Sequence, residues 1–191
     1  MEPPTSDPVA GVRGGGGLLN IHVYVLLHRE DDPLKNTAVK MVRMGLATLV
    51  DARRLRARPV VLNPYSQEYL GPWLRDTVLQ QGILVVDASW RRLSPSRFTG
   101  IRGLHVKLPP LLPGNPVNYG KPCILSSIEA VAASLYITGF HEEYSRLLGL
   151  YKWMKTFHEL NKELLDAYSK SKTPGELESA ISEFWPASPP C

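Results

Sequence analysis

Short apolar runs alternate with amphipathic stretches along the first half of the chain. Apolar runs of strand length, rich in β-branched and aliphatic residues, occupy residues 20–28, 59–64 and 82–87. Between them, apolar or small residues recur at the spacing of one helical face over residues 38–49 and 69–78. Strands that alternate with helices in this way predict a mostly parallel sheet with helices on its faces.

The pattern becomes helical in the second half of the chain. A last strand-like run at residues 104–109 overlaps the Pro-rich segment LPPLLPGNP, after which apolar stripes at helical spacing cover residues 125–135, 144–151 and 157–168. Residues 175–184 are predicted to form a final helix after a turn. We therefore expect a flexible tail at residues 1–19, an α/β domain at 20–106, an all-helical domain at 107–185 and a second tail at 186–191.

The chain is basic. Lys and Arg outnumber Asp and Glu by 22 to 18, and the isoelectric point is about 9.1, which favours an anionic partner such as nucleic acid. The segment ARRLRARP, residues 52–59, concentrates this charge. Its arginines either contact phosphates or form a solvated helix end, where cations face the negative end of the helix dipole. They are Arg53, Arg54, Arg56 and Arg58.

The cysteines and histidines argue against a disulfide scaffold and a metal site. Cys123 and Cys191 are the only cysteines and belong to no CxxC pair, so a reducing, cytoplasmic location is expected. The five histidines have no paired metal-ligand spacing. No apolar run approaches the roughly 20 residues that span a bilayer, and no apolar segment of a signal peptide is present, so we expect no membrane association.

Candidate chemistry lies where the predicted strands end, because parallel α/β sheets bind ligands beyond the carboxyl ends of their strands. Asp87 directly follows an apolar run and either contacts a ligand, accepts a proton or caps a turn. Trp90 either lines an apolar pocket or packs in the core. Thr37 precedes the first helical stripe, where it faces an anion or serves only as a helix cap.

The segment NPVNYGKPCILSSIEAVAASLY, residues 115–136, joins a Pro- and Gly-containing loop to a helix. Ser126 and Glu129 have the spacing of a capping box, in which each side chain accepts a hydrogen bond from the other residue's backbone amide. This leaves the Ser127 hydroxyl free, and the helix start presents its positive end to an anion. The loop and the helix start are therefore predicted to bind a carboxylate.

The motifs DPLKNT, LNP, VVDASW, NPVNYG and LSSIEA, in this order, closely resemble those of the small-subunit ribosomal RNA aminocarboxypropyltransferase family over residues 21–168. The resemblance implies a SPOUT-like fold, in which a parallel α/β domain precedes an all-helical domain and the chain forms a deep trefoil knot. It implies S-adenosyl-L-methionine (SAM) as the cofactor. It further implies transfer of the 3-amino-3-carboxypropyl group to N3 of a pseudouridine, usually N1-methylated, in small-subunit ribosomal RNA or a pre-ribosomal particle.

The resemblance also implies which residues bind SAM. Apolar walls would face the methyl group, backbone near two strand ends would bind ribose and adenine, and two hydroxyls would bind the carboxylate of the transferred group. The implied residues are Leu62, Pro64, Trp90, Leu125 and Ala130 for the walls, Val86 and Asp87 for the ribose, Leu108 and Cys123 for the adenine, and Thr37 and Ser127 for the carboxylate.

A carboxylate near this cleft would accept the uridine N3 proton, and Asp87 is the candidate base, with Glu129 as second choice. RNA would approach a basic rim, and we expect a monomer. The candidates for the rim are Arg53, Arg54, Arg56 and Arg58, then Arg75 and Arg146, with Arg91, Arg92 and Lys121 as further candidates. Two alternatives remain. One is a SPOUT-type RNA methyltransferase, against which the apolar walls argue, and the other is a ribosome-assembly factor that binds RNA and cofactor without turnover.

Overall fold

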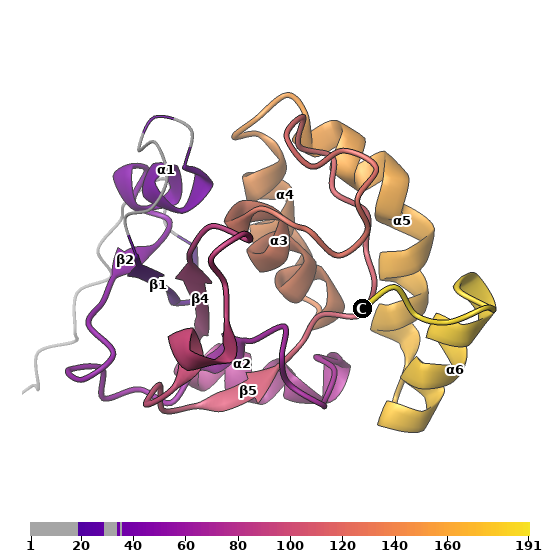
Figure 1. The fold of residues 1–191 in the computed structure, drawn as a ribbon, viewed down its shortest axis with the longest axis horizontal. Helices are drawn as coiled ribbons and strands as arrows, with labels where there is room; N and C mark the ends of the chain where they lie inside the picture. The colour runs from indigo at the N-terminus through magenta and orange to yellow at the C-terminus, as the bar shows by residue number, and fades with distance from the viewer. Residues whose placement is uncertain (1–18, 29–33, 35) are drawn as a thin grey trace, which may run out of the picture.

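A five-stranded parallel sheet forms the centre of the computed structural model, which describes residues 19–28, 34 and 36–191 (Figure 1). Every neighbouring pair of strands is parallel, so their carboxyl ends meet at one edge. The predicted tail at residues 1–19 lies almost entirely outside the described residues. The strands are β1 (Val23–Leu27), β2 (Thr48–Leu49), β3 (Val60–Leu62), β4 (Ile83–Asp87) and β5 (Leu104–Val106), in the order β2-β1-β4-β3-β5.

Four of these strands coincide with predicted apolar runs, whereas β2 lies outside them. β2 has only two residues, both exposed, so it has no apolar pattern to detect. Its segment was predicted to continue the first helix, which instead ends at Arg43. Gly45 adopts a positive φ of 73°, a conformation that suits glycine, and turns the chain toward the sheet edge.

The predicted helical stripes correspond to helices in the structure. The Tyr69 to Val78 stripe forms a 3-10 turn, η1 (Pro72–Leu74), that leads into α2. A second 3-10 turn, η2 (Pro95–Phe98), follows β4. The α-helices of the described residues are α1 (Thr37–Arg43), α2 (Arg75–Gln81), α3 (Ser127–Ile137), α4 (His141–Leu148), α5 (Met154–Lys170) and α6 (Pro174–Phe184).

The two faces of the sheet are covered differently, which departs from the expectation of helices on both. Alternate strand residues such as Val25, Val60 and Val85 point into the main core with the helices. The residues between them, such as Val61 and Leu84, pack against irregular segments around residues 50–55 and 93–101. Helices therefore build one face, and loops with η2 build the other.

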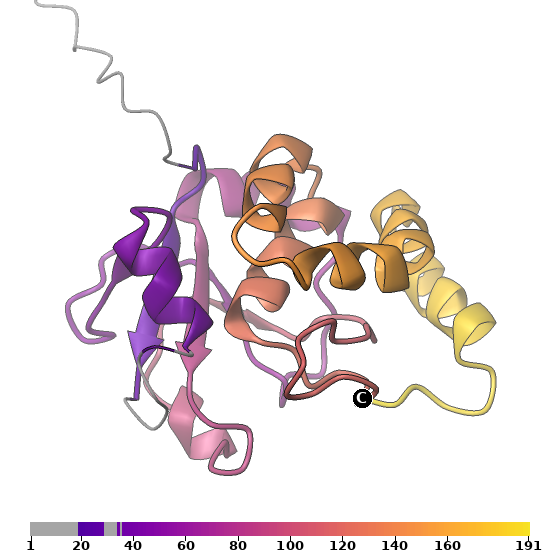
Figure 2. The ribbon, with the colours of Figure 1, turned by 90° about the horizontal axis from the view of Figure 1, so that it is seen from above.

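Helix α3 connects the sheet to the remaining helices. It contacts β4 and α1 on one side and α4 and α5 on the other, and α6 packs on α5 (Figures 1 and 2). Ile128, Val131, Ala132 and Leu135 are buried, and the small side chains of Ala132 and Ala133 let neighbouring elements approach closely. One apolar core consequently includes residues from the sheet and from α3 to α6.

A disulfide joins Cys123 to Cys191 across 68 residues, contrary to the expectation of reduced cysteines. It holds the C-terminal segment against the loop before α3, as Figures 1 and 2 show. The backbone carbonyl of Cys191 also accepts a hydrogen bond from the Tyr69 hydroxyl at 3.4 Å. Among the described helices, none combines the length and the apolar character needed to cross a membrane.

Candidate functional site

Three chain segments meet at the carboxyl edge of the sheet: the end of β4, the start of α1 and the start of α3. Asp87 is the last residue of β4 and pairs with Leu27 at the end of β1. α1 begins at Thr37 and α3 begins at Ser127. Direct contacts between α1 and α3 and between α3 and β4 bring the predicted residues Thr37, Asp87 and Ser127 together.

The Asp87 carboxylate receives a hydrogen bond from each of the two helix starts. Its Oδ1 accepts from the Ser127 hydroxyl at 3.0 Å, and its Oδ2 accepts from the Asn36 side-chain amide. Asn36 is buried and also caps α1, because its Oδ1 accepts from the Val39 amide at 3.0 Å. Asn36 therefore fixes the orientation of Asp87 relative to α1. Sequence reasoning missed this residue, although its position before a helical stripe is typical of a cap.

The two helix starts also contact each other directly. The Thr37 hydroxyl accepts a hydrogen bond from the Ile128 amide at 3.2 Å. Among the residues that the structure describes, none accepts a hydrogen bond from the Ser127 amide. The first turn of α3 thus keeps a donor at the positive end of its dipole, directly beside the Ser127 hydroxyl. The carboxylate that the sequence predicts at this helix start stays a prediction.

Apolar residues line the region next to this polar cluster. Trp90 follows β4, and its indole Nε1 donates to the Leu125 carbonyl at 2.9 Å. Leu62 and Leu125 are buried in the main core, and Leu108 and Ala130 pack against it. Val86, by contrast, belongs to the core on the opposite face of the sheet. Trp90 remains 38% exposed, so part of its ring is available to a ligand.

Pro64 and Cys123 lie at the margin of this group. Pro64 is exposed beyond the end of β3. The Cys123 amide donates to the Leu111 carbonyl at 2.8 Å, and its sulfur lies in the disulfide. Cys123 adopts a positive φ of 69°, which is unusual for a residue other than glycine and turns the backbone toward Leu125. The Cys123 amide is therefore bonded within the protein, and the predicted adenine contact of the backbone near Cys123 stays a prediction.

Glu129 organises the loop that precedes α3. The predicted capping box forms: Ser126 Oγ accepts from the Glu129 amide, and Glu129 Oε2 accepts from the Ser126 amide at 2.8 Å. Glu129 is 0% exposed and also accepts hydrogen bonds from the Gly114 amide, the Asn115 amide and side chain, and the Ser126 hydroxyl. The loop amides of Gly114 and Asn115 therefore bind an internal carboxylate. This corrects their assignment to a ligand and removes Glu129 as a second-choice base.

Two side chains of α5 hold the same loop. Asn161 exchanges hydrogen bonds with the backbone of Leu112, at 2.8 and 2.7 Å. The Tyr168 hydroxyl donates to the Pro110 carbonyl at 2.8 Å. Burial raises the pKa of Tyr168 to about 12, so its hydroxyl stays protonated and remains a donor at neutral pH. Gly114 lies so close to the Phe157 backbone that a Cβ there would come within 2.4 Å of the Phe157 nitrogen.

His28 and Arg97 form a further contact at this edge that the sequence did not predict. His28 follows β1, its amide donates to the Asp87 carbonyl at 3.0 Å, and its Nδ1 lies 2.9 Å from Arg97 Nη1. Because a guanidinium can only donate, His28 Nδ1 must accept, and the ring proton lies on Nε2. That Nε2 is buried, and it has no hydrogen-bond partner among the residues that the structure describes.

The predicted basic residues fall into two groups. Arg53, Arg54, Arg56 and Arg58 are exposed on the connection between β2 and β3. Arg91, Arg92 and Lys121 are also exposed, whereas Arg75 and Arg146 make contacts within the protein. Arg75 donates to the Thr138 carbonyl at 2.9 Å and stacks on Phe140, and Arg146 pairs with Glu142 at 2.9 Å. Within the described ranges, no cluster of His, Cys, Asp and Glu is arranged to hold a metal ion.

The Glu129 contacts generate a stability prediction. In Glu129→Gln, an amide nitrogen would face donors of the loop, so we expect the free energy of unfolding to fall by about 2–4 kcal/mol, measured by urea denaturation. Glu163→Gln, an exposed substitution on α5, is the matched control and should change stability little. Equal stability of the two variants would contradict the structural role of Glu129.

Comparison with known proteins agrees with these observations. A family model described as "Ribosome biogenesis protein, C-terminal" matches residues 60–185. The 16S rRNA aminocarboxypropyltransferase of Vulcanisaeta distributa is 44% identical over 138 residues, which cover 71% of this chain and 75% of the relative. The enzyme of the same name from Methanobrevibacter smithii is 41% identical over 137 residues, covering 71% of this chain and 80% of the relative.

A solved structure resembles the whole fold. The SAM-dependent rRNA:acp-transferase Tsr3 from Vulcanisaeta distributa matches with a TM-score of 0.76 and 36% sequence identity, over 88% of this chain and 98% of that chain. This neighbour supports an α/β fold with a five-stranded parallel sheet and six α-helices in the described residues. It does not support the SPOUT-like deep trefoil knot, and the predicted fold class is corrected accordingly. Hydrophobic periodicity predicts the type and order of elements and carries no information on how a chain is threaded.

The family model covers well over half of the chain, and the relatives exceed 40% identity over 71% of it. The chain belongs to the 16S rRNA aminocarboxypropyltransferase family of ribosome biogenesis proteins.

Proposed function

We propose that this protein transfers the 3-amino-3-carboxypropyl group of SAM to small-subunit ribosomal RNA during ribosome maturation. The observation that carries the proposal is the contact between Asp87 at the end of β4 and Ser127 at the start of α3, in a chain of this family. The acceptor that we propose is N3 of a pseudouridine, commonly N1-methylated. The names of the relatives support the reaction and the RNA, and the acceptor atom is the one that the family resemblance implies.

The residues at the sheet edge fit SAM in polarity. The Ser127 amide, at the positive end of α3, suits the carboxylate of the transferred group. The Ser127 hydroxyl donates to Asp87 and would contact that carboxylate by exchanging this bond. Thr37 lies beside them through its hydrogen bond to Ile128. Backbone around Val86 and Asp87 would bind the ribose, and backbone around Leu108 and Cys123 would bind the adenine. Leu62, Pro64, Trp90, Leu125 and Ala130 would supply apolar contacts.

Orientation determines which group is transferred. A sulfonium activates all three carbons attached to it, so the carbon that faces the acceptor in line is the one that reacts. When that carbon belongs to the aminocarboxypropyl group, its bond to sulfur breaks as the bond to N3 forms, and the rest of SAM leaves as the neutral thioether 5′-methylthioadenosine. The apolar surface of Trp90 and Leu125 would keep the methyl group away from the acceptor. The polar Thr37 and Ser127 would hold the aminocarboxypropyl group by its carboxylate. This division between polar and apolar walls favours aminocarboxypropyl over methyl transfer.

We propose Asp87 as the group that accepts the uridine N3 proton. Its carboxylate lies at the strand edge where ligands of parallel sheets bind. It accepts hydrogen bonds from Ser127 at the start of α3 and from Asn36 at the start of α1. The hydrogen bonds hold the carboxylate in a fixed orientation, as general-base catalysis requires.

RNA would meet the exposed arginines of the β2–β3 connection. Arg53, Arg54, Arg56 and Arg58 supply cations for phosphate contacts. Arg75 is left out of this surface because its guanidinium holds α2 to the end of α3. Arg146 remains a candidate on α4, although it pairs with Glu142. A monomer and a cytoplasmic location remain predictions, and the disulfide is unusual for a reducing compartment.

The transferred group can be identified by isotope labelling. We would incubate the protein with SAM labelled either in its carboxyl carbon or in its methyl carbon, and with small-subunit RNA that is unmodified or N1-methylated. We expect label from the carboxyl carbon alone to appear in the RNA. Methyl label alone would make the protein a methyltransferase, and no label despite SAM binding would make it a non-catalytic assembly factor.

The role of Asp87 is tested by Asp87→Asn, which keeps the shape and removes the base. We expect kcat to fall at least about 100-fold while the Kd for SAM changes by less than about tenfold. Asp76→Asn, an exposed substitution on α2, is the control and should leave both values unchanged. Near-normal turnover in Asp87→Asn would show that positioning suffices and that water takes the proton.

A further inference from the structure

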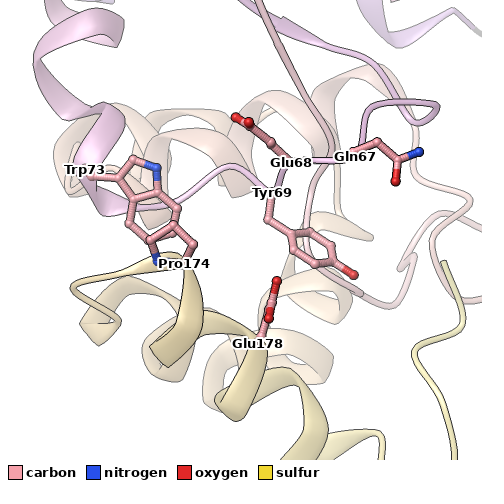
Figure 3. Close-up of a pocket in the computed structure, with 6 residues that line it drawn as sticks. All are labelled: Gln67, Glu68, Tyr69, Trp73, Pro174 and Glu178. Carbon is pink, nitrogen blue, oxygen red and sulfur yellow. The ribbon is translucent and has the colours of Figure 1, made fainter.

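A pocket of about 230 Å³ lies between the segment before α2 and the start of α6 (Figure 3). None of its lining residues belongs to the Asp87 cluster. Trp73 lies beside Pro174 on one side, and the Tyr69 ring lies between Glu68 and Glu178, as Figure 3 shows. The lining residues are Gln67, Glu68, Tyr69, Trp73, Pro174 and Glu178.

The aromatic rings of this pocket suit a cation. Trp73 is 37% exposed, which is unusual for a residue with so large an apolar ring. The Lys107 ammonium lies 4.6 Å from the centre of the Tyr69 ring, so this ring already takes part in a cation–π contact within the protein. Trp is the side chain that binds cations best in this way, and the Trp73 ring has no such contact among the described residues.

Two carboxylates add negative charge to the same pocket. Glu68 and Glu178 are exposed, and neither forms an ion pair with any residue that the structure describes. Burial raises the pKa of the Tyr69 hydroxyl, and the negative charge of Glu178 raises it further, which places Glu178 near that ring. Lys107 is the cation that faces Tyr69, so the pocket and its neighbour together carry one net negative charge.

We propose that this pocket binds an arginine side chain from a basic protein partner. A guanidinium can stack on the Trp73 indole while its N–H groups donate to Glu68 and Glu178. Arginine is favoured over lysine because its planar fork combines stacking with two directed hydrogen bonds. RNA is disfavoured, since phosphates would meet two carboxylates. The exposed arginines at Arg53 to Arg58 and this acidic pocket would therefore meet different partners.

The probe for this proposal is N-acetyl-arginine methylamide, with the citrulline compound as its uncharged isostere. We would titrate each into the full-length protein and follow the Trp73 indole N–H signal by NMR, assigned with Trp73→Phe. We expect a saturable shift with the arginine compound and none with citrulline. Glu178→Gln and Glu68→Gln should each weaken binding about three- to tenfold, whereas Glu183→Gln, an exposed substitution on α6, should leave it unchanged.

Three results would overturn the proposal. The first is no shift with the arginine compound, and the second is an equal shift with citrulline, which would make the site an apolar one. The third is a saturable shift with a uridine oligonucleotide that Glu178→Gln does not weaken, because the occupant would then be RNA. The outcome of this titration does not depend on SAM binding or on group transfer. Both can be measured separately in the same samples.

Discussion

The buried carboxylate of Glu129 is the interaction on which the candidate site depends. The chain crosses from the sheet to α3 over residues 107–126 without a helix or strand, so its backbone groups need other partners. Glu129 accepts from the Gly114, Asn115 and Ser126 amides, while Asn161 and Tyr168 hold the stretch between Pro110 and Leu112. Side chains of α3 and α5 thus replace secondary structure for this segment.

This anchoring determines where the start of α3 lies. Because the same carboxylate holds both the loop and the Ser126 amide, Leu125 and Ser127 have fixed positions next to the end of β4. From there Ser127 reaches Asp87, and the Leu125 carbonyl receives the Trp90 indole. Residues from the sheet segment and the helical segment are both required, so the site forms only when α3 has packed on the sheet.

The sequence predicted the local features of this arrangement and missed the distant ones. Four strands, the helical stripes and the capping box follow from periodicity and from spacing within a few residues. Glu129 lies at least 14 residues from Gly114 and Asn115, and no local pattern indicates that it meets them. For the same reason the loop amides were assigned to a ligand.

Other differences have equally physical causes. Cys123 and Cys191 are 68 positions apart in the sequence, and only the folded chain brings them together. Their spacing alone does not predict such a pair. β2 was missed because two exposed residues carry no periodicity. The second face of the sheet is covered by loops that contribute isolated apolar residues such as Leu55 and Phe98, which resemble ordinary loop residues in the sequence.

We expect SAM to bind where β4 and α3 meet. Backbone amide hydrogen exchange of the full-length protein, with and without SAM, measures this directly. SAM should slow exchange in segments 86–90 and 123–128 and leave exchange in α6 unchanged. No change in these two segments, or protection confined to the pocket around Tyr69 and Trp73, would contradict it.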